Sequence, residues 1–100
     1  MAVIKEDIPY GLRVGDDCMH LVENPREIQI LYDMMELIVQ DSHLIHVAEE
    51  LNSKGYRNRN GAKWTAASVF ALLPRLVEAG PQIFTSEEWV ARRRRLFYVS

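Results

Sequence analysis

The stretch from Asn24 to Gln40 constrains the fold most, because it predicts a long helix that is apolar on more than one side. Asn24 can cap the helix, Pro25 suits its first position, and Glu27 can complete a capping box. The apolar residues form one helical stripe and a second group beside it: Ile28, Leu31, Met35, Ile38 and Val39, then Ile30, Met34 and Leu37. Such a helix must lie at the centre of the core or take part in a contact between two chains.

A short hairpin is predicted ahead of this helix, at about residues 10–23. Two apolar runs, "YGLRV" at 10–14 and "HLVE" at 20–23, flank Gly15-Asp16-Asp17, whose residue types favour tight turns.

Two shorter helices are predicted in the middle of the chain, at about 43–54 and 65–73. The first should end at Gly55, since glycine takes the left-handed cap without strain. Thr65 should cap the second, and Pro74 should break or kink it, because proline disfavours helix at the residue before it.

The last predicted helix spans about 86–96 and opens with a capping box of Thr85 and Glu88. Ala79-Gly80-Pro81 should close the region ahead of it, and Arg92–Arg95 lie near its end, where cations suit the helix dipole. The predicted core comprises Leu31, Leu51, Trp64, Val69 and Leu72. Leu44, Val47 and Ala48 share a helix face with Leu51, Leu73 and Leu76 extend the buried face of the helix at 65–73, and Trp89 should point inward.

The length of 100 residues suits one domain with one modest core. We therefore expect a mainly α fold, a small helical domain with a helix-turn-helix and a short N-terminal β-hairpin.

No apolar run approaches about 18 residues, so no membrane span is expected, and the N-terminus lacks the apolar core of a signal peptide. The single cysteine, Cys18, excludes a disulfide framework or zinc ribbon within one chain, and a cytoplasmic location is expected.

Charge is unevenly distributed along the chain. Residues 1–50 hold eleven acids and three bases, whereas residues 51–100 hold nine bases and three acids, which gives −8 and +6 and a net charge of −2. The bases cluster in the loop 54–63 and at 92–95. A polyanion could bind the second half, although a solvated face with an exposed basic helix end explains the charges equally well.

Four segments resemble the recombinase domain of large serine recombinases. They are "PYGLRV" at 9–14, "LVENPREIQILYDM" at 21–34, "VAEELNSKGYRNRNGAKWTAASVFALL" at 47–73 and "PQIFTSEEW" at 81–89. The third is the most specific, with an Ala-x-x-Leu-Asn-x-x-Gly run, a basic turn, Gly-x-x-Trp and Val-x-x-Leu-Leu. The resemblance implies a small helical domain with a helix-turn-helix behind a hairpin.

The chain also departs from that family. The resemblance places the nucleophilic serine in a catalytic domain and a zinc site in a cysteine-bearing domain, and neither is present in these 100 residues. The serines at 42, 53, 68, 86 and 100 belong to no matching motif. Phe70-Ala71 and Pro74-Arg75-Leu76 stand where family members carry polar residues and an Asn-Pro-x-Tyr-like segment.

DNA binding requires phosphate contacts for affinity and polar side chains at base edges for specificity. Arg57, Arg59 and Lys63 are the expected phosphate ligands, with backbone donors near Thr65 at the start of the third helix. Base readout is predicted to be weak: Ala66, Ala67, Phe70 and Ala71 offer only apolar contacts, and Thr65 and Ser68 can also serve as caps. The predicted DNA-contacting set is therefore Arg57, Arg59, Lys63, Thr65, Ala67, Ser68 and Ala71.

The sequence thus predicts a non-catalytic DNA-binding module, either a stand-alone regulator of transcription or an accessory protein derived from a mobile element. The alternative is a protein-interaction or dimerisation domain, with a homodimer or partner contact through Phe70, Ile30, Met34 and Leu37. No cofactor is expected. His43 and His46 lie one helical turn apart, but no third ligand is evident, so no metal site is expected either.

Overall fold

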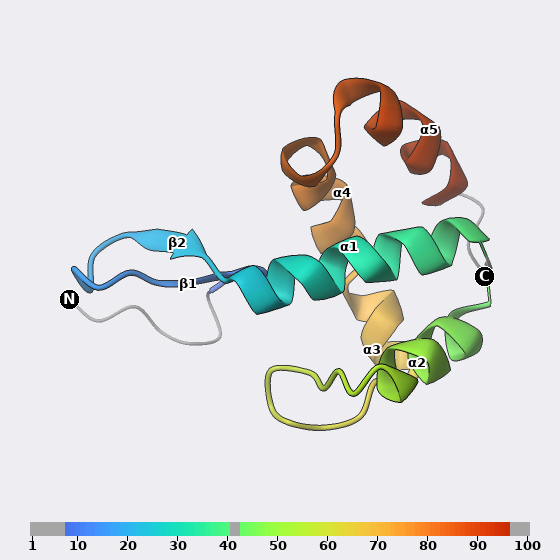
Figure 1. Ribbon diagram of the computed structural model, residues 1–100, viewed down its shortest axis with the longest axis horizontal. Helices are drawn as coiled ribbons and strands as arrows, with labels where there is room; N and C mark the ends of the chain where they lie inside the picture. The colour runs from blue at the N-terminus through green and yellow to red at the C-terminus, as the bar shows by residue number, and fades with distance from the viewer. Residues whose placement is uncertain (1–7, 41–42, 97–100) are drawn as a thin grey trace.

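The computed structural model describes residues 8–40 and 43–96, and it is mainly helical with a short antiparallel hairpin, as predicted (Figure 1). In chain order the elements are β1 (Leu12–Val14), β2 (Leu21–Glu23), α1 (Pro25–Gln40), α2 (Leu44–Ser53), α3 (Ala66–Ala71), α4 (Leu73–Ile83) and α5 (Ser86–Leu96). Among these residues, none of the helices is both long enough and apolar enough to cross a membrane.

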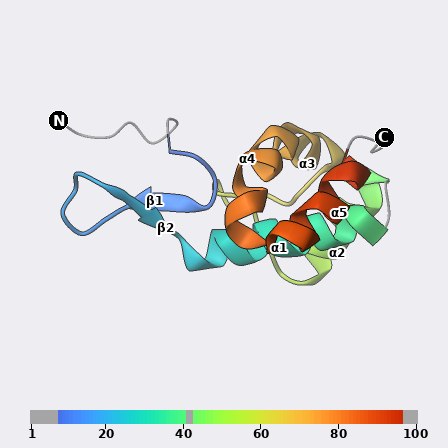
Figure 2. The same cartoon turned by 90° about the horizontal axis from the view of Figure 1, so that it is seen from above.

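The hairpin extends away from the helical body along the long axis of the molecule (Figures 1 and 2). Leu12 pairs with Glu23 and Val14 with Leu21, and Gly15 donates its N–H to the carbonyl of His20 to close the turn. At its base, Arg75 of α4 donates from Nε to the carbonyl of Tyr10 at 2.7 Å. The hairpin is therefore attached to the helices at its open end.

Helix α1 runs through the centre of the molecule, with α4 and α5 on one side of it and α2 on the other (Figure 1). Ile30, Leu31, Met34, Met35 and Ile38 are at most 1% exposed. The predicted partner surface on α1 is therefore wrong for Ile30 and Met34, which are core residues, while Leu37 packs against the core half-buried. The helix is apolar on more than one side because other helices of the same chain cover it.

Of the two capping contacts predicted at the start of α1, the structure shows one. Glu27 donates its N–H to Oδ1 of Asn24 at 3.3 Å, so Asn24 caps the helix. The Glu27 carboxylate does not complete a capping box, however, because it accepts from the N–H of Gly11 at 2.8 Å and from Arg59. The Asn24 N–H donates to the carbonyl of Gly11 instead. The carboxylate thus serves a tertiary contact.

The predicted helix at 65–73 is α3, which is shorter than predicted, and a further helix that was not predicted, α4, follows it. Helix α3 ends at Ala71 and α4 starts at Leu73, so the break falls one residue before the predicted site. Pro74 lies in the first turn of α4, where its missing N–H costs no hydrogen bond.

Helix α4 continues through Gly80 and Pro81, which were expected to end this region. Gly80 faces Trp89 of α5 so closely that a Cβ built there would lie 2.1 Å from the ring. Glycine is thus required here for packing, and the sequence pattern alone suggested a turn.

Most of the predicted core is confirmed. Trp64 and Trp89 are buried, and Leu51 and Val69 are fully enclosed. Leu72 and Leu73 were predicted as core but are half-buried, because they form the link between α3 and α4.

Candidate nucleic-acid interface

The basic loop between α2 and α3 is folded around the side chain of Asn58. Its Oδ1 accepts from the N–H groups of Asn60 and Ala62 at 2.9 Å each, and its own N–H donates to the carbonyl of Ala62 at 2.9 Å. Gly61 has a φ of +84°, which only glycine adopts readily, so the turn at Asn60-Gly61 requires a glycine at this position. The loop therefore holds its basic residues in a defined arrangement.

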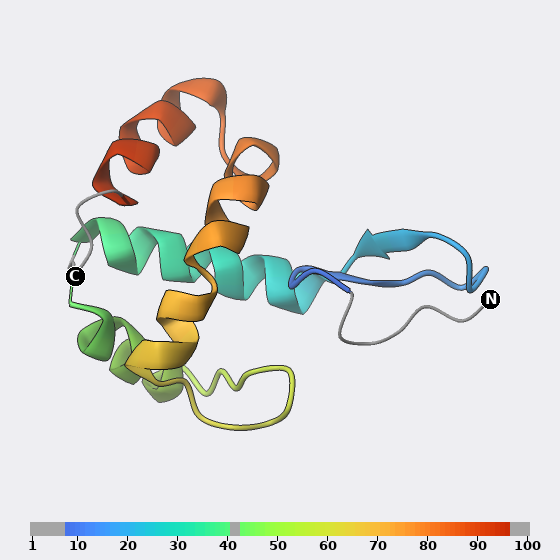
Figure 3. The same ribbon diagram turned by 180° about the vertical axis from the view of Figure 1, so that it is seen from behind.

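Asn52 joins the end of this loop to α2. Its Nδ2 donates to the carbonyl of Trp64 at 2.9 Å, and its Oδ1 accepts from the Trp64 N–H at 2.8 Å. Since the indole of Trp64 is also buried in the core, Trp64, two residues before α3, is fixed on both its main chain and its side chain. Asn52 thereby sets where α3 begins relative to α2, and the two helices lie side by side (Figure 3).

The first turn of α3 is capped as predicted. Ser68 donates its N–H to Oγ1 of Thr65 at 3.1 Å, and Thr65 donates its N–H to Oγ of Ser68 at 2.8 Å. The two hydroxyl groups thus satisfy each other's backbone. Because the helix has only six residues and its first turn is already capped, we assign no phosphate site to its N-terminus.

Arg59, a predicted phosphate ligand, is used within the molecule. Its Nη2 and Nε donate to the two oxygens of Glu27 at 2.7 and 3.0 Å. Nη1 donates to the carbonyl of Ile8 at 2.7 Å, and Nη2 also reaches that of Pro9 at 3.1 Å. A guanidinium with this many partners connects the loop to α1 and to the hairpin, and we exclude it from the set of phosphate ligands that we propose.

Tyr10 lies beside this ion pair. The guanidinium carbon of Arg59 is 5.3 Å from the centre of the Tyr10 ring, and the same ring meets Trp64 edge-on at 5.9 Å. Burial, and secondarily the Glu27 carboxylate, raise the pKa of Tyr10, so its hydroxyl stays neutral. The cluster joins the hairpin, α1 and the loop.

The other cations of the loop are placed differently. Arg57 is half-buried and donates from Nη1 to the carbonyl of Tyr56 at 2.7 Å. Lys54 follows the end of α2 and Lys63 precedes Trp64, and both are exposed. These two lysines are therefore the loop cations best placed to meet a polyanion.

The outer face of α3 is apolar. Ala67 and Ala71 are exposed, and Phe70 is 64% exposed. Ile45 of α2, which is 54% exposed, lies across from them on a shallow groove of about 550 Å³. The groove is lined by His43, Leu44, Ile45, Ala66, Ala67 and Phe70.

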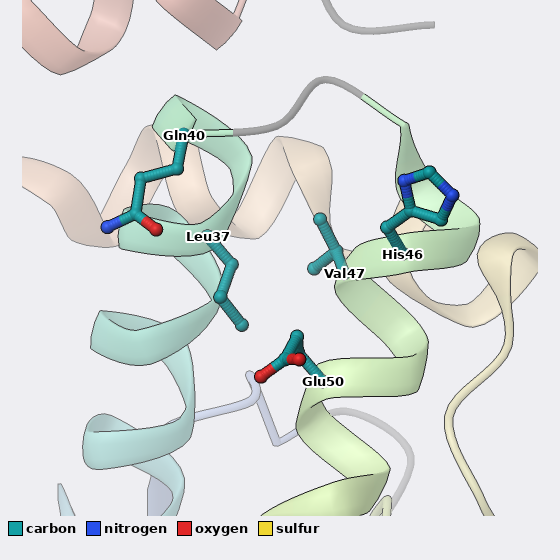
Figure 4. A pocket seen from close by; sticks show the side chains of 5 residues that line it. All are labelled: Leu37, Gln40, His46, Val47 and Glu50. Carbon is teal, nitrogen blue, oxygen red and sulfur yellow. The ribbon is translucent and has the colours of Figure 1, made fainter.

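A second hollow, of about 260 Å³, lies between α1 and α2 (Figure 4). Leu37 and Val47 lie between the two helices, Glu50 reaches toward α1, and the ring of His46 is turned away from Glu50 (Figure 4). Within residues 8–40 and 43–96, no three His, Cys, Asp or Glu side chains are grouped to hold a metal ion. We assign no ligand to this hollow.

Three residues that shape the site were missed from the sequence. Asn52 and Asn58 read as ordinary helix-end and loop residues, and Glu27 as a capping residue, because their partners lie elsewhere in the chain or in the loop backbone. The local Asn58-x-Asn60-Gly61 pattern was the one available signal for the loop, since asparagine commonly bonds backbone N–H groups two residues on.

The structure thus defines a small helical domain in which a basic loop leads into a short helix with an apolar outer face. Comparison with known families agrees with a single family for most of this chain: the family model described as Recombinase matches residues 25–96. The chain therefore belongs to the Recombinase family. No curated protein and no solved structure matches it.

Proposed function

We propose that this chain is a non-catalytic DNA-binding module, in which α2, the loop and α3 act as a helix-turn-helix that holds duplex DNA mainly by its phosphates. The family membership supports DNA as the partner. The four sequence segments described above further suggest the large serine recombinases as the branch, and hence a regulator of transcription or an accessory protein derived from a mobile element.

The observation that carries this proposal is the position of two exposed lysines at the ends of the loop, next to a helix that bears no charge. Lys54 follows α2 and Lys63 lies three residues ahead of Ala66, the first residue of α3. Lysines in such positions neutralise phosphates and release counterions, which supplies most of the affinity of non-specific DNA complexes. Arg57 is the third candidate.

Polar base readout is limited at this face. The hydroxyls of Thr65 and Ser68 are engaged with each other's backbone, and the exposed positions Ala67 and Ala71 have no polar side-chain atoms. A dissociation constant in the roughly micromolar range or weaker at physiological salt is therefore expected, as for non-specific complexes.

The connection between the two helices is longer than the three- or four-residue turn of compact helix-turn-helix proteins. Two contacts offset this length. Asn52 fixes the residue before α3, and Arg59 fixes the loop to α1. A long loop held in this way still presents α3 in one orientation.

We also propose that these residues carry no catalytic activity. A nucleophilic serine needs a base within hydrogen-bond reach. Ser53 donates its hydroxyl to the carbonyl of Glu50, and Ser68 donates to that of Thr65, so both serve the backbone. Strand cleavage by the pure protein would contradict the proposal.

One observation favours the alternative of a protein-binding module. Phe70 and Ile45 are exposed apolar side chains on one groove, and such surfaces often bind proteins. Of the partner surface predicted from sequence, Phe70 alone is strongly exposed, so a protein contact would centre on this groove and not on α1.

The two functions differ in their response to salt. Fluorescence anisotropy of a labelled mixed-sequence duplex, titrated with protein over a salt series, should give a linear log–log decrease in affinity. In Lys54→Ala/Lys63→Ala the slope should become shallower by about two units, because each lost phosphate contact removes about one.

The matched control is Arg93→Ala/Arg94→Ala, which also removes two exposed cations but from α5, on the opposite side of α1 from the loop (Figure 1). The log–log salt slope of this control variant should equal that of the unsubstituted protein. Absence of binding even at low salt, or equal slopes in both variants, would contradict phosphate binding by the loop.

A further inference from the structure

We propose that the groove between the start of α2 and the outer face of α3 reads the C5-methyl groups of pyrimidines, above all thymine, in the major groove of DNA. This inference rests on the proposed function and specifies which chemical feature of the duplex the module recognises. It concerns the apolar groove residues, whereas the phosphate contacts concern Lys54 and Lys63.

The groove has the shape and chemistry for small apolar groups. Ala66 and Ala67 form one wall with Phe70, and Ile45 stands opposite. Alanine side chains allow the helix backbone to approach a base edge closely, and Phe70 and Ile45 add two large apolar surfaces that the fold leaves 64% and 54% exposed.

Among the groups that base pairs present in the major groove, the thymine methyl is the apolar one, and the rest are hydrogen-bond donors and acceptors. Alanine and phenylalanine are among the side chains that contact this methyl group. A donor or acceptor pressed against Ala67 or Phe70 would lose its water without gaining a partner, which is unfavourable. The groove therefore selects for methylated pyrimidine edges both by attraction and by exclusion.

Charge favours DNA over a protein as the occupant. The six residues of α3 carry no charge, and Lys63, which is exposed, lies three residues ahead of the helix. A phosphate held by Lys63 would bring the neighbouring base edges to Ala66 and Ala67. A purely apolar protein contact would gain nothing from a lysine at the edge of the groove, because the charged amino group would have no anionic partner there.

The test removes methyl groups and leaves every phosphate in place. Anisotropy titrations should compare an alternating A·T duplex with the same duplex made with deoxyuridine. Affinity should fall about fourfold for each methyl group that the groove buries, the factor expected for one methylene-sized group. The salt slope should not change. In the reverse direction, an alternating G·C duplex should bind more tightly when its cytosines are 5-methylated.

Phe70→Ala tests whether the groove is responsible. Because Phe70 is 64% exposed, its replacement should leave the fold intact, and the thymine-to-uracil ratio should move toward one with an unchanged salt slope. The control is Val90→Ala, which removes another exposed apolar side chain, 58% exposed, from α5, and it should keep the original ratio.

Equal binding of the thymine and deoxyuridine duplexes would overturn this inference while leaving phosphate binding intact. So would a ratio that Phe70→Ala does not alter. Self-association in analytical ultracentrifugation that Phe70→Ala abolishes, together with equal binding of the two duplexes, would assign the groove to a second copy of the chain. Failure to bind any duplex would instead remove the proposed function itself.

Discussion

The two sides of α1 are built from the same kinds of parts. On one side the loop and α3 are joined to the core by Trp64 and to α1 by an ion pair between Arg59 and Glu27. On the other side of α1, where Figure 3 shows α5, this helix is joined to the core by Trp89 and to α1 by an ion pair between Arg92 and Glu36. Each side also starts its last helix with a threonine-based capping box.

The carboxylates of the two ion pairs differ in how much protein surrounds them. The Glu27 side chain is 10% exposed and also accepts from the N–H of Gly11, while Arg59 reaches backbone carbonyls of the hairpin. The Glu36 side chain is 30% exposed, and Arg92 lies over the ring of Phe84. The pair of Arg59 and Glu27 connects the loop, α1 and the hairpin, whereas the pair of Arg92 and Glu36 connects α5 with α1.

This difference shows that a cluster of cations in a sequence combines two kinds of residue. In each cluster one arginine is a structural tie to α1, and neighbouring cations, Lys54 and Lys63 or Arg93 and Arg94, are exposed. Counting bases therefore overestimates the charge that a basic segment can offer to a partner.

The largest effect should come from the tryptophan beneath the loop. Trp64→Ala should lower the free energy of unfolding by about 3–5 kcal/mol, the range for truncating a buried large aromatic. Chemical denaturation measures it. Trp64→Phe is the control and should cost less, because the Trp64 indole nitrogen has no hydrogen-bond partner within the described structure. An unchanged midpoint for Trp64→Ala would mean that the loop is not anchored by this residue.

The two ion pairs should differ when their arginines are removed. Arg59→Ala should cost about 2–3 kcal/mol, somewhat less than the loss of a fully buried pair, because it leaves the enclosed Glu27 carboxylate without its cation. Arg92→Ala should cost about 1 kcal/mol, because the Glu36 carboxylate that it leaves behind is 30% exposed and stays partly hydrated.

A double-mutant cycle separates the pair from packing. If Arg59 acts through Glu27, the variant Arg59→Ala/Glu27→Ala should lose less stability than the sum of the two single variants. Equal losses of unfolding free energy for Arg59→Ala and Arg92→Ala would mean that the two ion pairs stabilise the fold to the same extent.

The smallest effect concerns the two capping boxes. Hydrogen bonds from Thr85, first from its backbone N–H, lower the pKa of Glu88 below its usual value, whereas the corresponding residue of α3, Ser68, does not titrate in this range. A carboxylate with a lowered pKa in the folded state stabilises it fully above its unfolded value, and this contribution is lost as the pH falls through the folded value.

As the pH falls below the usual range of a glutamate, the protection factor of the Thr85 N–H should therefore fall, while that of the Thr65 N–H should stay unchanged relative to the rest of the fold. Amide exchange followed by NMR measures both in one sample. Glu88→Gln should abolish the pH dependence at Thr85, and parallel changes at both sites would point to global unfolding.

The local parts of the fold were predictable because their causes lie within a few residues. Asn24-Pro25, Thr65 with Ser68 and Thr85 with Glu88 mark helix starts through bonds three residues apart. Gly55 and Gly61 mark positive φ values of +84° each. Helix α4 was missed because Pro74 and Gly80 suggest a break when their surroundings are unknown.

By itself, the sequence determined that this protein is a helical domain behind a hairpin, and which apolar faces become the core, because capping, turn geometry and hydrophobic periodicity act over short separations. Tertiary structure decided which cations bind other parts of the chain, and at which position packing requires a glycine. Arg59 meets Glu27 across 32 residues, and Gly80 makes room for Trp89 of the next helix. Such partners are selected by distance and packing in three dimensions, which the order of residues along the chain does not reveal.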